Sequence, residues 1–192
     1  MKTLEVTWRG LTPIILHSDQ CVNPLHPISR ALKPLTGKRN KTEEDLIAIS
    51  NLEWESGCYW RDDIGVYIPA ENVEATLRKA ATDFRKGKDV VKYVMCSDLY
   101  IPLNYGEKLT KEQLIADHQY RDVRPMTVQR AKVLRTRPRF DMWSITFKLC
   151  YDETKMDLDT LVSIMENAGA YTGLCDSRPK YGKFAATIRE LD

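Results

Sequence analysis

Residues 143–151 read WSITFKLCY, so apolar and polar side chains alternate along the whole segment. This period of two predicts a half-buried β-strand over 140–151. A helix is expected next, over 157–168, because Asp157 is a suitable N-cap, apolar residues recur at helical spacing, and Gly169 can end it. Residues 183–190, KFAATIRE, alternate again and predict a last strand.

Two further strong elements lie earlier in the chain. The alternation from Leu4 to Trp8 predicts a strand over 3–9, and residues 70–84 carry an apolar face at helical spacing. With a further strand placed within 121–137, the order of elements is βαββαβ. This order predicts an α+β fold with a ferredoxin-like, RRM-like core, in which both helices cover one face of an antiparallel sheet. The other face would be open to a ligand.

Size and composition predict a soluble globular protein. The chain has 192 residues, of which 43% are hydrophobic and 29% are charged. We expect a single domain, 1–192, with insertions at about 18–62 and 104–120. Because the net charge is only +2, any binding of nucleic acid must depend on local clusters of charge.

The sequence gives no signal for a membrane, a disulfide framework or a metal. No apolar run reaches the length of a membrane span, and the first residues lack the apolar segment of a signal peptide. The five cysteines are odd in number and widely spaced, without a CxxC pair. We therefore expect reduced cysteines in a cytoplasmic protein, with no metal and no cofactor.

The basic stretch of the chain is 121–139, with seven Arg or Lys residues and one acid, Asp122. One interpretation is a solvated strand pair whose arginines protect an edge from aggregation. The charge excess goes beyond that need and favours contact with phosphates, which would be salt-sensitive and weakly sequence-selective. From charge alone, the residues assigned to this contact are Arg124, Arg130, Lys132, Arg135 and Arg137.

A basic loop bracketed by glycines, 173–183, separates the second helix from the last strand. Glycine permits positive φ and close backbone approach, and the loop carries three cations. Taken alone, the pattern is typical of a helix C-cap followed by a solvated turn. Its position after the second helix of a βαββαβ unit favours a loop that holds a phosphate backbone. The residues assigned to it are Gly173, Arg178, Lys180, Gly182 and Lys183.

Three segments resemble the RAMP superfamily, the RNA-binding proteins of CRISPR effector complexes. Residues 12–17, TPIILH, are similar to the TPLHIG opening of that family, and residues 67–78, YIPAENVEATLR, resemble its strand-to-helix turn. Residues 173–184 are similar to its glycine-rich loop, although an alanine and a Cys-Asp pair replace usual glycines in the last two segments. The whole chain also resembles short proteins encoded by tailed phages and prophages.

The resemblance implies a non-catalytic protein that holds single-stranded nucleic acid, with RNA favoured over DNA, in a phage- or prophage-carrying bacterial cell. It implies contacts through Asn72 and Arg78 at the first helix, and through Arg178, Lys180 and Lys183 in the loop. The family's backbone subunits polymerise along RNA. A free sheet edge and the N-terminal insertion likewise favour head-to-tail homo-oligomers here.

Two other classes of function stay open. Some RAMP relatives cleave RNA without a metal, and His17 and Asp19 lie where the resemblance would place a catalytic histidine or acid. The simpler interpretation is that His17 packs at the end of a strand and Asp19 caps a turn, so we do not expect an enzyme. The other class is a phage protein that interferes with a host defence system, by contact with a protein or by sequestering a nucleotide.

Overall fold

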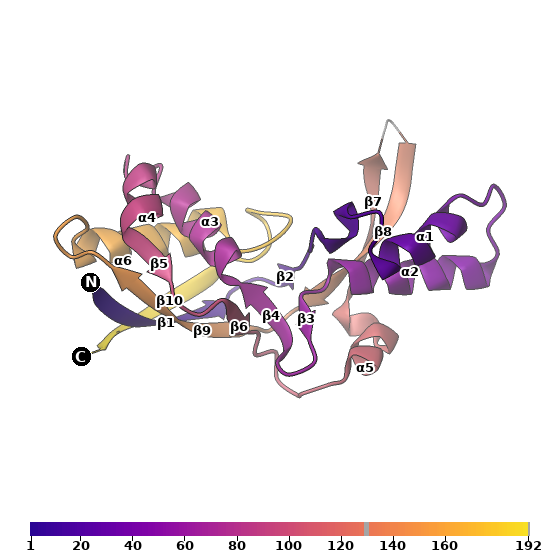
Figure 1. Cartoon of the computed structure of the whole chain (residues 1–192), viewed down its shortest axis with the longest axis horizontal. Coiled ribbons are helices and arrows are strands. Elements are labelled where there is room, and N and C mark those ends of the chain that lie inside the picture. Colours follow the sequence, from indigo (N-terminus) through magenta and orange to yellow (C-terminus); the bar gives the residue numbers. More distant parts are fainter. Residues whose placement is uncertain (129–130, 192) are drawn as a thin grey trace. The chain divides into compact units, whose positions relative to one another are not determined.

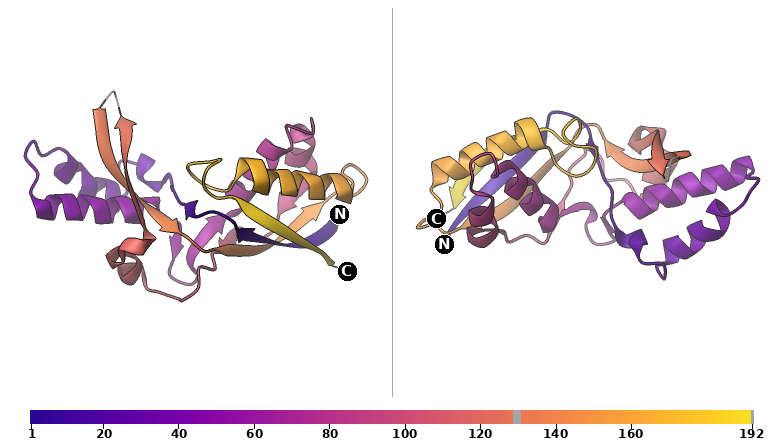
Figure 2. Two further views of the ribbon diagram at one scale, coloured as in Figure 1. Left: turned by 180° about the vertical axis from the view of Figure 1, so that it is seen from behind. Right: turned by 90° about the horizontal axis from the view of Figure 1, so that it is seen from above.

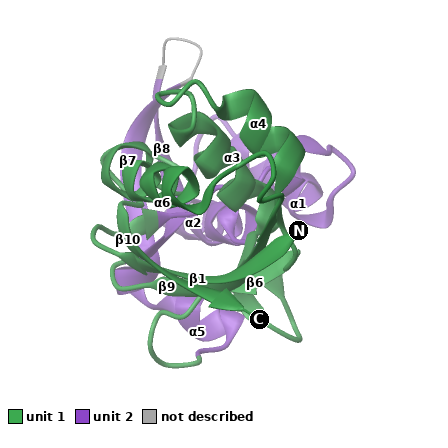
Figure 3. Cartoon of the chain, turned by 90° about the vertical axis from the view of Figure 1, so that its left-hand side faces the viewer, with its two compact units in different colours: residues 1–14, 60–108, 141–192 green, residues 15–59, 109–140 purple. Residues whose placement is uncertain are grey.

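The computed structural model describes residues 1–128 and 131–191. Over these residues the chain is an α+β protein with three small antiparallel sheets and six α-helices (Figure 1). The predicted α+β class is confirmed. The chain divides into two compact units (Figure 3): unit 1 comprises residues 1–14, 60–108 and 141–192, and unit 2 comprises residues 15–59 and 109–140.

A four-stranded sheet with the order β10-β1-β9-β5 is the centre of unit 1. Strand β1 pairs antiparallel with both β9 and β10, so that Val6 lies opposite Phe147 on one side and Ile188 on the other. The strands are β1 (Lys2–Gly10), β5 (Val94–Cys96), β9 (Ser144–Tyr151) and β10 (Phe184–Leu191). The structure therefore has strands at the three places where alternating apolar and polar residues predicted them, namely β1, β9 and β10.

Three helices lie on one side of this sheet: α3 (Ala70–Ala80), α4 (Gly87–Tyr93) and α6 (Leu158–Asn167) (Figure 3). Asp157 is the N-cap of α6, as predicted, because its side chain accepts a hydrogen bond of 2.8 Å from the Thr160 amide. A second, three-stranded sheet orders its strands β3-β4-β6. Its members are β3 (Trp60–Arg61), β4 (Gly65–Pro69), which leads directly into α3, and β6 (Tyr100–Pro102).

The core of unit 1 is organised around Trp8. Its ring stacks on Phe184 with centroids 4.0 Å apart and meets Phe147 edge-on at 5.1 Å. The side chain is fully buried, yet its indole N–H has no hydrogen-bond partner among the described residues. Aromatic contacts and apolar burial therefore hold Trp8 in place despite an unsatisfied donor.

The strand expected within 121–137 is not part of the sheet that contains β1, so this prediction was wrong. The position beside β9 is taken by β5, whose residues Val94–Cys96 lie opposite Leu149, Cys150 and Tyr151. Three residues are too few to show an alternating pattern, which explains why the sequence did not reveal this strand. The basic segment instead forms a hairpin in unit 2.

Gly169 does not end the helix before it. The chain continues from α6 as a π-helix, Ala168–Thr172, and turns only at Gly173, where φ is 78°. A Cβ on Gly169 would lie 2.1 Å from the Phe184 carbonyl oxygen. The glycine is therefore required for the close approach of β10 to this helical segment, rather than for a C-cap.

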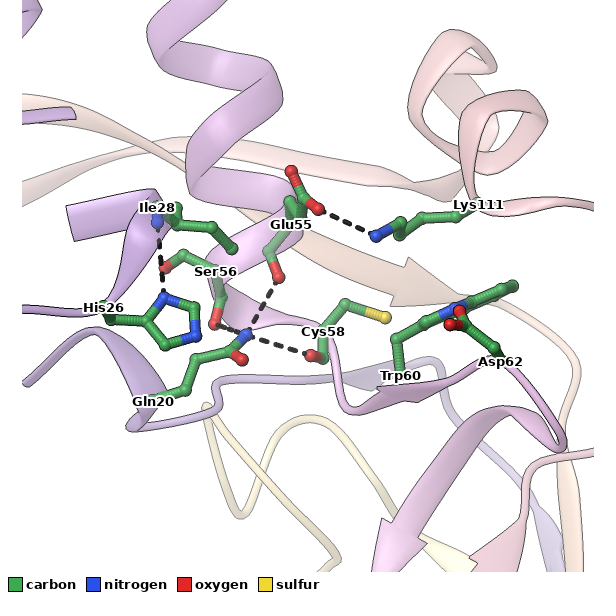
Figure 4. A network of polar contacts seen from close by, with 9 residues as sticks. All are labelled: Gln20, His26, Ile28, Glu55, Ser56, Cys58, Trp60, Asp62 and Lys111. Carbon is green, nitrogen blue, oxygen red and sulfur yellow. Dashed lines mark hydrogen bonds and ion pairs between the residues drawn. The ribbon is translucent and has the colours of Figure 1, made fainter. Parts of the chain in front are cut away.

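Unit 2 contains α1 (Pro27–Thr36), α2 (Glu43–Gly57) and α5 (Lys111–Ala116), with short 3₁₀ turns at Gln20–Val22 and His118–Tyr120. The last turn of α2 is closed by Gln20, whose side-chain amide donates to the carbonyls of Glu55, Ser56 and Cys58 at 2.8 to 3.3 Å (Figure 4). Carbonyls at the end of a helix lack partners from a following turn, and these bonds from Gln20 supply partners at the end of α2 and at its C-cap, Cys58. Lys111 of α5 forms an ion pair of 2.8 Å with Glu55.

The third sheet has the strand order β2-β8-β7, with β2 at Ile14–Ile15, β7 at Arg121–Val128 and β8 at Ala131–Phe140. Strands β7 and β8 form an antiparallel hairpin and run side by side (Figure 2). Helix α2 packs against β8 through hydrogen bonds such as that between the Ser50 and Thr136 hydroxyls, 2.8 Å long. The Trp54 indole N–H donates to the Tyr120 carbonyl at 2.7 Å and fixes the start of the hairpin.

Candidate nucleic-acid interface

The backbone of the glycine-rich loop, 173–183, is fixed by hydrogen bonds at both of its ends. Across the loop, the Leu174 amide donates to the Gly182 carbonyl at 2.9 Å. The Gly182 amide donates to the Pro13 carbonyl at 2.8 Å, and the Lys183 amide to the Thr12 hydroxyl at 3.0 Å. The segment that follows β1 therefore holds the base of the loop in one position.

Two glycines make this closure possible. Gly173 and Gly182 have φ values of 78° and 72°, in the region that side chains rarely adopt. A Cβ on Gly182 would lie 2.0 Å from the Leu174 carbonyl oxygen, and one on Gly173 would lie 2.7 Å from the Tyr181 carbonyl oxygen. The two glycines noted in the sequence thus lie at the neck of a closed loop, where residues 173–174 meet residues 181–182. There is no room for a side chain at either glycine.

The cations of the loop differ in exposure. The side chains of Arg178 and Lys180 are exposed, whereas Lys183 is half-buried at the loop's base. The Arg178 guanidinium lies 3.4 Å from the Thr76 hydroxyl on α3, and the Lys180 ammonium lies 5.6 Å from the Tyr181 ring centroid. The outer part of the loop therefore presents two positive charges to solvent on a restrained backbone.

Helix α3 contacts the loop through one side only. The Asn72 side-chain amide donates to the Cys175 sulfur at 3.6 Å, and the Thr76 hydroxyl donates to the Gly173 carbonyl at 3.3 Å. Arg78 is exposed and lines a groove between α3 and α4 instead. Of the two residues predicted on this helix, the structure brings Asn72 to the loop and places Arg78 elsewhere.

Burial raises the pKa of the Cys175 thiol to about 12, although the hydrogen bond from Asn72 and the charge of Arg178 act in the opposite direction. A thiol with this pKa has about a thousandfold less thiolate at pH 8 than an ordinary cysteine. Cys21 and Cys175 are both half-buried, and because the pKa of Cys175 is raised we expect iodoacetamide to alkylate it more slowly than Cys21 in the native protein, as measured by peptide mass spectrometry. In urea the two rates should become equal, and equal rates in buffer would contradict this loop structure.

The arginines of the basic stretch have carboxylate partners that the sequence did not reveal. Arg124 and Arg135 lie opposite one another on β7 and β8. Arg124 forms an ion pair with Asp122, and Arg135 forms one with Glu53 of α2. Glu53 is buried and also accepts a hydrogen bond of 2.9 Å from the Thr136 amide. Arg135 therefore stabilises the hairpin against α2, whereas Arg124 pairs with an acid of its own strand.

The other predicted residues of the hairpin have varied environments. Lys132 is exposed near the end of the hairpin, and Arg137 is half-buried. Arg130 lies outside the described residues. Arg121, which begins β7, donates to the Ile115 carbonyl, the Ser50 hydroxyl and the Asn51 side chain, so its role is also structural.

His17 and Asp19 lie on the exposed segment before the first 3₁₀ turn of unit 2. The Asp19 carbonyl accepts a hydrogen bond of 2.9 Å from the Val22 amide, and the His17 carbonyl accepts one of 3.3 Å from the Tyr59 hydroxyl. Both contacts use backbone atoms and shape the turn. Among the described residues, no group of three His, Cys, Asp or Glu side chains is arranged to hold a metal ion.

A cluster of cations on α3 and α4 was not predicted from the sequence. Lys79, Lys88 and Lys92 join Arg78 around one groove, and all four side chains are exposed. The signal was present in the sequence as two basic pairs, at 78–79 and at positions 88 and 92, one helical turn apart. It was missed because residues 87–93 are too few to show a clear helical period.

Comparison with known proteins adds no relative: no protein-family model matches the chain, and no curated protein sequence matches it. Over the described residues, no helix is both long and apolar enough to cross a membrane.

Proposed function

We propose that this chain is a non-catalytic protein that binds single-stranded nucleic acid, with RNA favoured, through its phosphate backbone. One observation carries the proposal: Arg178 and Lys180 are exposed on a loop whose neck is closed by Gly182 and the segment after β1. A restrained loop loses little conformational entropy when it binds, so its cations can contribute effectively to affinity. Phosphate contacts by Arg and Lys supply most of the sequence-independent binding energy in such complexes.

We also propose a ferredoxin-like core for unit 1. Strands β1, β5, β9 and β10, with α3 and α6 between them in sequence, give the order βαββαβ, and the sheet order β10-β1-β9-β5 suits that fold. This arrangement is compatible with the resemblance to the RAMP superfamily. Many unrelated functions share this fold, so the fold alone does not define what the chain binds.

The side chains on the open face of the sheet favour contacts with phosphates over sequence-specific contacts with bases. It carries polar side chains such as Thr7, Thr146 and Lys148, and Arg189 forms an ion pair of 2.8 Å with Glu5. Recognition of single-stranded bases commonly uses aromatic side chains on such a sheet. We therefore expect weak sequence selectivity, and head-to-tail assembly along RNA stays a prediction.

The loop cations provide the direct test. Replacing both Arg178 and Lys180 by alanine is expected to weaken binding of a fluorescein-labelled single-stranded RNA about tenfold, because two phosphate contacts are lost. The slope of log affinity against log salt concentration should fall by about 1.4, since each contact to a single strand contributes about 0.7. Fluorescence anisotropy at several salt concentrations measures both quantities, with single-stranded DNA of the same sequence alongside.

A matched control is Lys108→Ala with Lys155→Ala, which removes two exposed lysines outside the loop. This variant should keep the affinity within about twofold, because long-range charge effects are screened by salt. If wild-type protein binds neither RNA nor DNA at low salt, or if both variants lose affinity equally, the loop is not the binding site. Shortening of the RNA during the assay would instead favour the nuclease alternative.

A further inference from the structure

The groove between α3 and α4 is a second concave surface of unit 1, with a volume of about 450 Å³. Arg78 and Lys79 form its wall on α3, and Lys88 and Lys92 form its wall on α4. Among the residues that the structure describes, no acidic one lines it. The groove is thus bounded by four cations on two helices.

The local charge is unusual for this chain. Residues 78–92 contain six Arg or Lys residues and two Asp residues, an excess of four, whereas the whole chain has a net charge of +2. One of these acids, Asp89, already forms an ion pair of 3.1 Å with Lys86, which does not line the groove. Among the described residues, no acidic side chain on the groove walls offsets this positive charge. A negatively charged ligand would therefore complement the groove.

The uncharged part of the groove lining includes an exposed apolar side chain, Val91, which is 61% exposed. A small molecule would be poorly enclosed here, because its binding sites usually bury most of the ligand. Single-stranded nucleic acid usually binds to cations interleaved with aromatic side chains, and no aromatic residue of the described part of the chain lines this groove. A groove with an exposed apolar side chain and cations on both walls is complementary to an amphipathic helix whose apolar stripe is flanked by acidic residues.

We propose that the α3–α4 groove docks an acidic amphipathic helix of a partner protein. The apolar stripe of that helix packs on Val91, and its carboxylates face the cations on the two walls. Lys88 and Lys92 lie one turn apart, about 6 Å along α4, which matches carboxylates at positions i and i+4 of the partner. This surface is separate from the loop contact of α3, which uses Asn72 and Thr76.

The charges of the adjoining surface determine which half of the docked helix can be acidic. A neighbouring pocket along the same two helices shares Arg78 and Val91 but is also lined by Glu71 and Glu74. Acidic residues of a partner would be repelled there, so they must be confined to the part of the helix that lies over Lys79, Lys88 and Lys92. The groove therefore selects a helix that is acidic over one half of its length.

A designed peptide tests this proposal without knowledge of the natural partner. The probe is a fluorescein-labelled helical peptide with leucines along one face and glutamates flanking them, and its counterpart has glutamine in place of each glutamate. Wild-type protein should bind the acidic peptide at least tenfold more tightly than the glutamine peptide. Amide NMR shifts on binding should be confined to the two helices that line the groove and its adjoining pocket, residues 71–94.

Charge reversal locates the site. Lys88→Glu with Lys92→Glu should weaken binding of the acidic peptide at least tenfold, and the milder Lys88→Gln with Lys92→Gln should give a smaller loss in the same direction. Lys108→Glu with Lys155→Glu, a control of equal charge change, should bind as wild type does. Arg178→Ala with Lys180→Ala should also retain the peptide, which separates this test from that of nucleic-acid binding. Circular dichroism checks that each variant is folded.

Three results would overturn the proposal. The first is equal binding of the two peptides, or unchanged binding by both α4 variants. The second is displacement of the peptide by single-stranded RNA with shifts at the same amides, which would assign the groove to nucleic acid. The third is self-association of the wild-type protein that the Lys88→Glu, Lys92→Glu variant abolishes, which would place a second copy in the groove.

Discussion

Gly182→Ala is expected to lower the free energy of unfolding by about 3 kcal/mol, through backbone strain and a steric clash. At a φ of 72° an alanine is strained, and its Cβ would lie 2.0 Å from the Leu174 carbonyl oxygen. Relief of the clash would break the hydrogen bond between Leu174 and Gly182 that closes the loop. Urea unfolding followed by circular dichroism measures the loss, and RNA affinity should fall with it.

Gly106→Ala is the matched control for this substitution. Gly106 also has a positive φ, 103°, but no heavy atom lies within 4 Å of the position of its Cβ. The backbone strain is then present without the clash, and we expect a cost of about 1 kcal/mol. Equal losses for the two variants would show that the neck of the loop is not closed as described.

Trp8→Ala should have the largest effect on the stability of unit 1, a loss of about 3 to 5 kcal/mol. The substitution removes a fully buried ring that contacts both Phe147 and Phe184, and so opens a cavity between β1, β9 and β10. Thermal and urea unfolding measure this loss.

Trp8→Phe separates packing from hydrogen bonding. Phenylalanine keeps an aromatic ring in the site and removes an indole N–H that has no partner among the described residues. The cost of the smaller volume is then partly offset by removal of an unsatisfied buried donor, so we expect a loss of about 1 kcal/mol or less. A loss as large as that of Trp8→Ala would indicate that the indole N–H does make a stabilising contact.

The parts of the fold that could be predicted from the sequence are those with long periodic patterns. Strands β1 and β9 have alternating apolar residues over eight or nine positions, and α6 has both an N-cap and an apolar face. The three residues of β5 offer no such pattern. Alternation also predicts that a segment is a strand without giving its partner, which is why the basic strand was assigned to the wrong sheet.

The candidate site could be predicted only in part, for a similar reason. Gly173 and Gly182 signal a tight loop through residue type alone, because glycine is required where φ is positive and space is absent. The pairing of Arg135 with Glu53 joins residues 82 positions apart, and no local pattern could reveal it. The cations of the α3–α4 groove likewise become one surface only when the two helices pack together.

The position of β1 between β9 and β10 has a consequence for synthesis of the chain. Thr3 pairs with Cys150 and with Leu191, so the first strand has no neighbouring strand until β9, which ends at Tyr151, has left the ribosome. All residues of unit 2 precede residue 141, so that unit is complete just before either sheet partner of β1 has been made. The nascent chain must therefore carry an apolar, unpaired β1 through most of translation, which makes it a natural substrate for ribosome-associated chaperones.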